Sequence, residues 1–421
     1  MNNPRRLLSP NSLFLCVIFL GILDSNAAAA AQDAPQPETF METELIVTLE
    51  PGTPASSLRP ILEAHGAVIA QALDDRVIRV SAAPGMTESL KAALEKSRGI
   101  SRVDYNHTLR ANFIPSDAFY SWQWHLPDVQ APTAWDITRG DPRVVIAVLD
   151  SGVDAAHPNL RGKVIGGYNF INNTPDAVTD SYGHGTMVAG IAAAPTGAGG
   201  VVGVCPECSI MSVVVADGKG CSNDFALSRG IRYAADNGAK IINISYGGAV
   251  NNPILRDAVN YAWSKGAVII ASAGNEASSA RSFPAAYANV IAVSALDKDN
   301  RPAGFTDYGS WIDISAPGVG IVTTGLHGKY ASGSGTSFSA AIIAGLAGLI
   351  YSENPDLTNT QVVHIITNFT DRMDSEGFDR YYGFGKANLE KALAEAKELS
   401  SAKPGATLKG TSYTRLNKKV F

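Results

Sequence analysis

The sequence predicts an α/β protein in which a small α+β domain precedes a larger domain, whose parallel sheet is covered by helices on both faces. The apolar runs of the larger region are nearly continuous in Val, Ile and Ala, which is typical of strands buried on both faces. Segments of helical periodicity separate these runs, as the crossovers of a parallel sheet require. The preceding region has shorter amphipathic segments, which indicate a small α+β domain.

The composition excludes several classes of protein. A chain of 421 residues allows two to three domains and a large core. Because 45% of the residues are hydrophobic and 17% are charged, disorder over most of the length is excluded. The net charge of -5 gives no basic field, so nucleic acid is not expected as a partner. Specificity must therefore come from local sites.

Residues 1–31 have the features of a secretory signal peptide. Arg5 and Arg6 precede an apolar stretch at 13–23, and the small-residue run 27–31 follows it. The stretch is shorter than the roughly 20 residues of a membrane span, although an uncleaved anchor is the alternative. We expect a secreted protein, extracellular or periplasmic, with no stable membrane anchor.

The small domain is predicted at 43–112. Alternation at 45–49 and 77–81 indicates strands, and 56–64 and 89–94 have the spacing of amphipathic helices. These segments predict the order strand, helix, strand, strand, helix, strand, which is ferredoxin-like. A domain of this size is marginally stable alone and needs a partner surface.

The larger domain is predicted at 113–394. Its predicted strands are 144–149, 210–215, 241–245, 268–271 and 290–294. Ligands of parallel sheets lie beyond the carboxyl ends of the strands, where this chain has Asp150, Ser245 and Asn275. The apolar segment 340–350 is about half a membrane span, so we expect a buried core helix.

The last segment, 395–421, loses the periodicity and is rich in lysine. We expect a solvated tail there. An interaction arm is the alternative, but scattered charges do not require one.

Three residues of the larger domain could form a nucleophilic site. Asp150 ends a buried strand, where an unpaired carboxylate is costly. His184 lies between two glycines, which leave its imidazole accessible. Ser337 precedes an apolar helix, so its hydroxyl lies at a helix N-terminus, where N–H groups and the dipole suit a developing oxyanion. A serine needs a base to take its proton, and the base needs an orienting group.

The segments around these residues, 147–153, 183–186 and 335–340, resemble the three signature segments of subtilisin-like serine proteases, in the same chain order. The resemblance extends from about residue 121 to 393 and is closest to the thermitase-like group. It implies that Asp150 orients the histidine, that His184 is the general base and then acid, and that Ser337 is the nucleophile. Asn275 and the Ser337 N–H are implied as the oxyanion donors. The predicted function is a secreted serine endopeptidase acting on proteins or peptides, expected as a monomer.

In this family the substrate binds as an extended strand between two chain segments. The matching residues here are Gly218, Lys219, Gly220, Ser245, Tyr246, Gly247, Ala273 and Gly274. Backbone recognition predicts broad specificity. This chain departs from the usual pattern at Met187, Ala341 and Ile342, and Tyr246 replaces a common Leu; the catalytic groups are all present.

The resemblance also implies that the domain at 43–112 is an inhibitory propeptide, removed by self-cleavage near 110–113. No cofactor is required for the chemistry, but family members often bind structural calcium. Asp117 matches a calcium ligand, whereas Asn159 replaces its usual partner and the loop 197–200 lacks polar ligands. A structural calcium is therefore possible and optional.

The cysteines of the mature chain are few. Cys205 and Cys208 are expected to form a short-loop disulfide in an exported protein; zinc binding is a weaker alternative, because no second ligand pair follows. Cys221 is then free. We expect an inert, partly buried thiol, with sensitivity to thiol reagents as the alternative.

Two other functions are alternatives. A catalytically impaired subtilase-fold binding protein would lack a catalytic residue, yet all are present. A nucleotide-binding enzyme is suggested by the glycines at 197–203, which lack the dinucleotide-binding register. Fluorophosphonate labelling of Ser337 would separate the protease from both.

Overall fold

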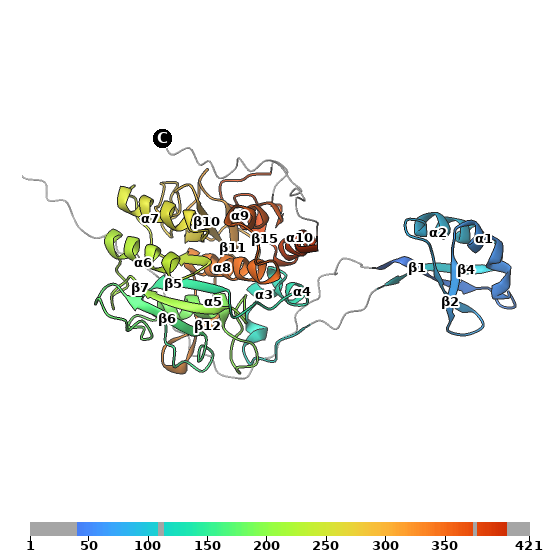
Figure 1. Cartoon of the computed structure of the whole chain (residues 1–421), viewed down its shortest axis with the longest axis horizontal. Helices are drawn as coiled ribbons and strands as arrows, with labels where there is room; N and C mark the ends of the chain where they lie inside the picture. The colour runs from blue at the N-terminus through green and yellow to red at the C-terminus, as the bar shows by residue number, and fades with distance from the viewer. Residues whose placement is uncertain (1–39, 108–112, 374–376, 402–421) are drawn as a thin grey trace, which may run out of the picture. The chain divides into compact units, whose positions relative to one another are not determined.

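A computed structural model describes residues 40–107, 113–373 and 377–401 (Figure 1). The chain divides into two compact units, with the boundary in the sequence near residue 112, and each unit is described by itself. The predicted signal peptide, the bonds at 110–112 and the end of the predicted tail lie outside the described residues.

The first unit is an antiparallel sheet with two helices. Its elements are β1 (Phe40–Leu49), α1 (Arg59–Ala64), β2 (Val68–Ala72), β3 (Val77–Ser81), α2 (Thr87–Glu95) and β4 (Ile100–His107). The strand order is β2-β3-β1-β4, and the core contains Leu45, Val47 and Leu90. The predicted order of strands and helices is confirmed.

The second unit contains a nine-stranded sheet with the order β14-β15-β11-β10-β9-β8-β5-β7-β6, in which all neighbours are parallel except β14 and β15. The strands of the unit are β5 (Val145–Asp150), β6 (Val164–Asn169), β7 (Ser209–Val214), β8 (Ile241–Ile244), β9 (Val268–Ser272), β10 (Val290–Leu296), β11 (Ile314–Pro317), β14 (Thr370–Asp371) and β15 (Lys386–Ala387), with a separate hairpin of β12 (Ile321–Thr324) and β13 (Tyr330–Gly333). The predicted parallel sheet is confirmed, and each predicted strand is present with small shifts at its ends.

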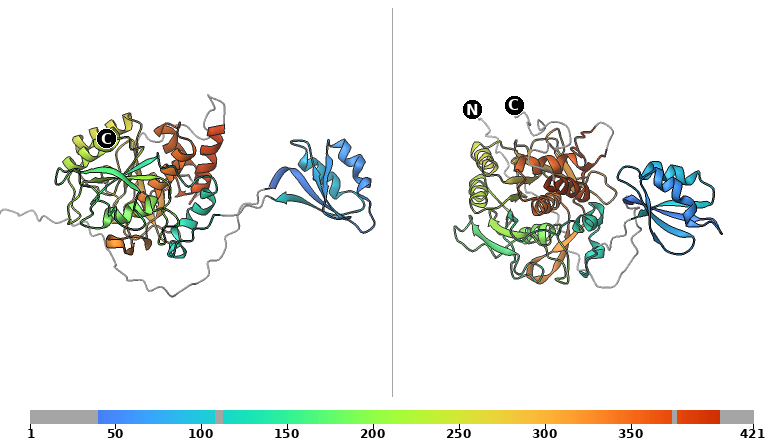
Figure 2. Two further views of the ribbon diagram at one scale, coloured as in Figure 1. Left: turned by 60° about the horizontal axis from the view of Figure 1, so that its bottom comes forward. Right: turned by 45° about the vertical axis from the view of Figure 1, so that its right-hand side comes forward.

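Helices cover both faces of this sheet (Figure 2). On one face lie α5 (His184–Ala193) and α8 (Thr336–Glu353), with α9 (Asn359–Asn368) and α10 (Leu389–Ser401) packed around α8. On the other face lie α6 (Asp224–Asp236) and α7 (Pro253–Ser264). Alternate residues of β5 enter the two cores: Ile146 and Val148 pack with α5 and α8, while Ala147 and Leu149 pack with α6 and α7. This two-sided burial explains why the strands are continuously apolar. Two short helices, α3 (His125–Asp128) and α4 (Ala131–Trp135), precede the sheet.

Two helices bear on the sequence predictions. The predicted core helix is α8, which has the length and hydropathy of a membrane span but is mostly buried in the unit, as expected. Residues 395–401, which we expected in a solvated tail, are instead part of α10, which continues to Ser401. Leu393 and Ala396 are buried on the inner face of α10, at the spacing that extends its apolar stripe.

Candidate active site

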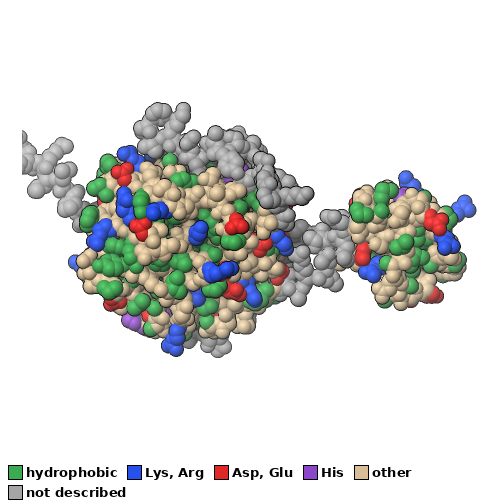
Figure 3. All heavy atoms as spheres, viewed as in Figure 1, with side chains coloured by type: hydrophobic (Ala, Val, Ile, Leu, Met, Phe, Trp, Pro, Cys, Tyr) green, Lys and Arg blue, Asp and Glu red, His purple; other side chains and the backbone are tan. Residues whose placement is uncertain are grey.

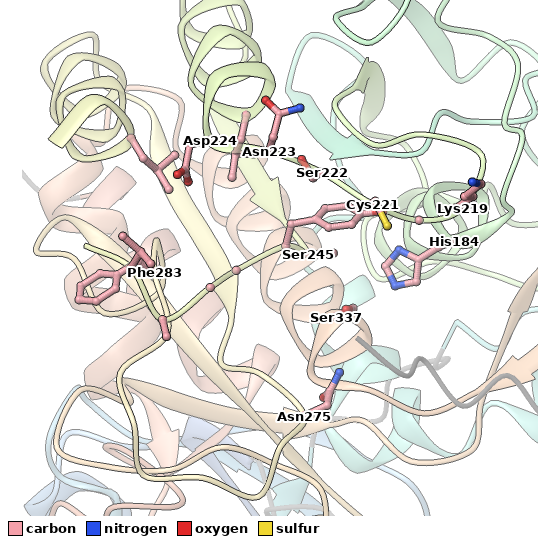
Figure 4. Close-up of a pocket in the computed structure, with 18 of the residues that line it drawn as sticks. His184, Lys219, Cys221, Ser222, Asn223, Asp224, Ser245, Asn275, Phe283 and Ser337 are labelled. Carbon is pink, nitrogen blue, oxygen red and sulfur yellow. The ribbon is translucent and has the colours of Figure 1, made fainter. Parts of the chain in front are cut away.

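A cavity of about 780 Å³ lies in the second unit, where β5 and β8 end and where α5 and α8 begin (Figure 4). Ligands of parallel α/β sheets bind at this edge. Its lining includes Tyr182, His184, Lys219, Gly220, Cys221, Ser245, Tyr246, Asn275 and Ser337. The cavity therefore brings together three of the four predicted catalytic residues, and Asp150 lies behind them.

The carboxylate of Asp150 holds His184. Both carboxylate oxygens lie 2.9 Å from His184 Nδ1, and the backbone N–H of Ser151 donates to Oδ1 at 2.8 Å. Asp150 is completely buried, so these donors compensate for the loss of solvent around its charge. With Nδ1 held, the other ring nitrogen of His184 is left to act in the cavity.

A second carboxylate fixes the backbone around His184. Asp180 accepts hydrogen bonds from the N–H groups of Tyr182, Gly183 and Thr186 at 2.8 to 3.0 Å, and from the Thr186 hydroxyl at 2.7 Å. The Ser151 hydroxyl also donates to Asp180 at 2.8 Å. These bonds satisfy N–H groups that a helix start leaves unpaired. Asp180 thereby links the end of β5 to the start of α5.

The surroundings of His184 favour its protonated form. Burial alone would lower the pKa of His184, but the Asp150 carboxylate, with a further contribution from Asp180, raises it above its ordinary value. The imidazole also stacks on the Phe338 ring, with centroids 6.0 Å apart and planes at 21°. His184 is thus both oriented and made more basic.

Ser337 is the second residue of α8, where helix N–H groups lack partners within the helix. Figure 4 shows His184, Ser337 and Asn275 directed into the same cavity. In the described part of the chain no hydrogen bond joins Ser337 to His184. Such bonds are often long in an enzyme without substrate and tighten when it binds.

The amide of Asn275 is oriented by Thr336. Asn275 Oδ1 accepts from the Thr336 N–H at 2.9 Å and from its hydroxyl at 3.0 Å. The Nδ2 donor is therefore left for the cavity. Gly274, which precedes Asn275, has φ of 123°, and a Cβ there would lie 2.2 Å from Asp307 Oδ2, so this close approach requires glycine.

Most of the predicted substrate-binding residues line the cavity. Lys219 and Gly220 form one wall, and Ser245, Tyr246 and Gly247 form another. The other three, Gly218, Ala273 and Gly274, are not among the lining residues. Ala273 is completely buried, and the Gly274 N–H donates to Thr336, so both lie behind the wall.

The residues around Asp117 do not fit a calcium ion. Asp117 Oδ2 accepts from the Thr196 hydroxyl and the Gly197 N–H, and Oδ1 accepts from the Gly199 N–H, at 2.9 to 3.2 Å. Asn159 Oδ1 accepts from the Val201 N–H and the Tyr330 hydroxyl. Calcium needs six to eight oxygen ligands, whereas here N–H and O–H donors occupy the acceptor oxygens. The searched residues, 40–107, 113–373 and 377–401, contain no group of three His, Cys, Asp or Glu that could hold a metal.

The cysteines agree in part with the prediction. Cys205 and Cys208 form the expected disulfide. Cys221 is free, but it is exposed and lines the cavity, so the expectation of a partly buried thiol is wrong. The segment that carries Cys221 forms a tight turn around the Asp217 carboxylate, which leaves the thiol outside.

Sequence reasoning missed the residues that hold the predicted catalytic groups, above all Asp180 and Thr336. Asp180 stands four residues before His184 and Thr336 directly precedes Ser337. Polar residues so close to a candidate catalytic residue are a usable signal, but the partners of each come from distant segments.

Comparisons with known proteins point to one family. The sequence profile described as the Subtilase family matches residues 141–385. A thermophilic serine proteinase of Bacillus sp. (strain AK1) is 40% identical over 73% of this chain and 76% of its own length. Thermitase of Thermoactinomyces vulgaris is 42% identical over 67% of this chain and 99% of its own length.

Two further comparisons extend this result. An alkaline protease of Alkalihalobacillus alcalophilus is 32% identical over 92% of this chain and 98% of its own length. Among solved structures, sphericase is similar with a TM-score of 0.56 and 34% identity, over 59% of this chain and 92% of its own.

Proposed function

Because the chain belongs to the subtilase family and is a serine endopeptidase, we propose that Asp150, His184 and Ser337 are its catalytic triad. One observation supports this most strongly. His184 Nδ1 lies 2.9 Å from both oxygens of the buried Asp150, while His184 itself lines the same cavity as Ser337. That is the arrangement in which a histidine is held in the tautomer that accepts a proton from serine.

The proposed reaction has two halves. His184 Nε2 takes the proton of Ser337 Oγ as Oγ bonds to the substrate carbonyl carbon, and then gives that proton to the amine nitrogen as the peptide C–N bond breaks. In the second half a water molecule gives one proton to His184 and attacks the acyl carbon. The proton returns to Ser337 Oγ as the ester bond breaks. Catalysis in this family needs no cofactor.

The negative charge of each tetrahedral intermediate would be stabilised by Asn275 Nδ2 and the Ser337 N–H. The Thr336 contacts hold the Asn275 amide before substrate arrives, so little reorganisation is needed. Ser337 lies at the N-terminus of α8, whose dipole favours negative charge there.

We propose that substrates bind as an extended strand between the wall of Lys219 and Gly220 and the wall of Ser245 to Gly247. The support is that two chain segments flank the cavity in front of Ser337. Backbone recognition would accept many sequences. On the face seen in Figure 3, acidic and basic side chains are interspersed.

The decisive experiment is fluorophosphonate labelling followed by peptide mapping. We expect the label on Ser337, and we expect Ser337→Ala to lose both labelling and peptide hydrolysis. Ser334→Ala, three residues earlier, is a matched control that should retain both. Undiminished hydrolysis in Ser337→Ala would refute the assignment.

We further propose that the first unit, within 43–112, is a propeptide that inhibits the protease until self-cleavage near 110–113. The unit has a core of its own, and the match to the alkaline protease, over 92% of the chain, extends into it. Ser337→Ala should accumulate as the uncleaved chain, while the active protein should begin near residue 110. A mature N-terminus before residue 87 would contradict this proposal.

The protein is proposed to be exported, extracellular or periplasmic, after removal of residues 1–31. Two arginines, a short apolar stretch and small residues, in that order, support this proposal. Mass spectrometry of the uncleaved Ser337→Ala protein in culture medium and cell fractions tests it. Residues 1–31 retained on the cellular protein would contradict it.

A further inference from the structure

The phenol of Tyr246 touches both the carboxylate and the imidazole of the site. The Tyr246 hydroxyl donates to Asp150 Oδ1 at 3.4 Å, and the ring meets the His184 ring edge-on, with centroids 6.2 Å apart and planes at 63°. Tyr246 follows β8 and also lines the cavity. One side chain thus belongs both to the substrate wall and to the surroundings of Asp150.

We propose that Tyr246 is a positioning residue of the triad, whose hydroxyl draws part of the Asp150 charge away from His184 and whose ring fixes the imidazole. The Tyr246 hydroxyl would then help to set the pH at which His184 becomes a base. This inference rests on the proposed function, because it takes His184 to be the base.

The donors around Asp150 explain why the Tyr246 hydroxyl matters. Oδ1 receives the Ser151 N–H at 2.8 Å as well as His184, while Oδ2 receives His184. The Ser151 hydroxyl lies 3.3 Å from Oδ1 but donates to Asp180 at 2.8 Å, and a hydroxyl has a single proton to give. Tyr246 is therefore the hydroxyl whose proton is free for Asp150.

The Tyr246 contact is a weak hydrogen bond, since 3.4 Å exceeds the usual O–H···O distance. A donor to a carboxylate still lowers the negative potential that a neighbouring imidazole feels. Burial, and next the charge of Asp150, raise the pKa of Tyr246 above its ordinary value, so the phenol stays protonated and remains a donor through the working range.

The ring of Tyr246 contributes separately from its hydroxyl. Phe338 stacks on the His184 imidazole with planes at 21°, whereas Tyr246 meets it edge-on. With the Asp150 bond, these contacts restrain tilting as well as rotation of the ring. Among the described residues, the titratable groups that line the cavity or act on His184 are Asp150, Asp180, Tyr182, Tyr246, Lys219, Cys221 and Asp224.

The test is the pH dependence of kcat/KM in Tyr246→Phe, which removes the hydroxyl and keeps the ring. Active-site titration with a fluorophosphonate sets the enzyme concentration, so a poorly folded fraction does not enter kcat. We expect the acid limb to move up by roughly 0.2 to 0.5 pH unit, because Asp150 loses a donor and stabilises imidazolium more strongly. kcat should change more than KM, since the substrate wall is kept.

Two further variants separate the hydroxyl from the ring. Tyr246→Leu removes both, so we expect the same shift of the acid limb and a larger loss of kcat. Tyr182→Phe removes a different phenolic hydroxyl from the same cavity and should leave the acid limb in place.

The inference is overturned if the acid limb of the kcat/KM profile of Tyr246→Phe is unchanged or moves to lower pH. It is also overturned if Tyr182→Phe shifts the acid limb by the same amount. If the wild-type enzyme itself fails to label at Ser337, the proposed triad is wrong instead. The two failures are thus distinguishable.

Discussion

The side-chain oxygen of Asn275 is held by Thr336, through the Thr336 N–H at 2.9 Å and the Thr336 hydroxyl at 3.0 Å. Thr336 is completely buried and directly precedes Ser337, so the proposed nucleophile and the proposed oxyanion donor share one support. The amide of Asn275 is set before substrate binds, which is the condition under which such a donor is most effective.

Removing either member of this pair should lower kcat with little change in KM. For Asn275→Leu we expect a loss of about 10² to 10³ in kcat, because a donor to the oxyanion is lost. Thr336→Val should cost roughly fivefold, since one neutral hydrogen bond of about 1 kcal/mol that orients the amide disappears. Steady-state kinetics on a short peptide substrate measure both effects.

Thr336→Ser is the matched control, because it keeps the hydroxyl. It should retain most of the activity. If Thr336→Val raised KM and left kcat unchanged, Thr336 would act in substrate binding rather than through Asn275.

A chelator should leave thermal stability unchanged, because the Asp117 oxygens already accept N–H and O–H donors. Asp117→Ala should lower the free energy of unfolding by about 1 to 3 kcal/mol, since it leaves the Thr196, Gly197 and Gly199 donors without their acceptor. Calorimetry of the fluorophosphonate-inhibited protein, with EDTA or with added calcium, measures both. A fall of Tm in EDTA that is absent from Asp117→Ala would show a calcium ion at Asp117.

The sequence predicts five of the buried strands and the residues at their ends, because both follow from local pattern. Asp150, at the end of β5, and Ser245, directly after β8, are two such strand-end residues. Four strands of the sheet, β6, β11, β14 and β15, and the hairpin of β12 and β13 were not predicted. β6 contains two glycines and is partly exposed, β14 and β15 have two residues each, and the buried β11 has the short sequence Ile-Ser-Ala-Pro, so none of the four carries a long run of branched apolar residues.

The residues that hold the proposed catalytic side chains in place were harder to predict than those side chains themselves. Asp180 lies in a loop, and its function follows from donors on two segments that the fold brings together, Ser151 after β5 and the start of α5. Ala273 shows the converse: it lies two positions before Asn275 in sequence but is buried away from the cavity, because it continues the sheet beyond β9 and its N–H donates to the Val293 carbonyl. Adjacency in sequence does not give the direction of a side chain.

His125 should make the protein less stable in acid. It is completely buried, neither ring nitrogen has a hydrogen-bond partner within the described chain, and burial lowers its pKa to about 3 from an ordinary 6.5. His125 is therefore protonated at a lower pH in the folded state than in the unfolded state. The stability that neutral His125 provides is complete above pH 6.5 and is lost at about 1.4 kcal/mol per pH unit between 6.5 and 3.

His125→Leu, which keeps an apolar side chain of similar size, should flatten this dependence. Urea unfolding of the inhibited protein at pH 7 and pH 5 is the measurement, and the difference between the two values should shrink in the variant. An unchanged difference would mean that His125 is protonated without cost in the folded state.

The exposed thiol of Cys221 should make the enzyme sensitive to bulky thiol reagents. Cys221 lines the cavity next to Lys219 and Gly220, on the wall where we propose that substrate binds. A maleimide with a large substituent should raise KM or abolish hydrolysis, whereas a small alkylating agent should inhibit less, because the block is steric. Cys205 and Cys208 are joined and offer no thiol. Cys221→Ser should be as active as the wild type and resistant to the reagent, and inhibition that persists in this variant would place the sensitive group elsewhere.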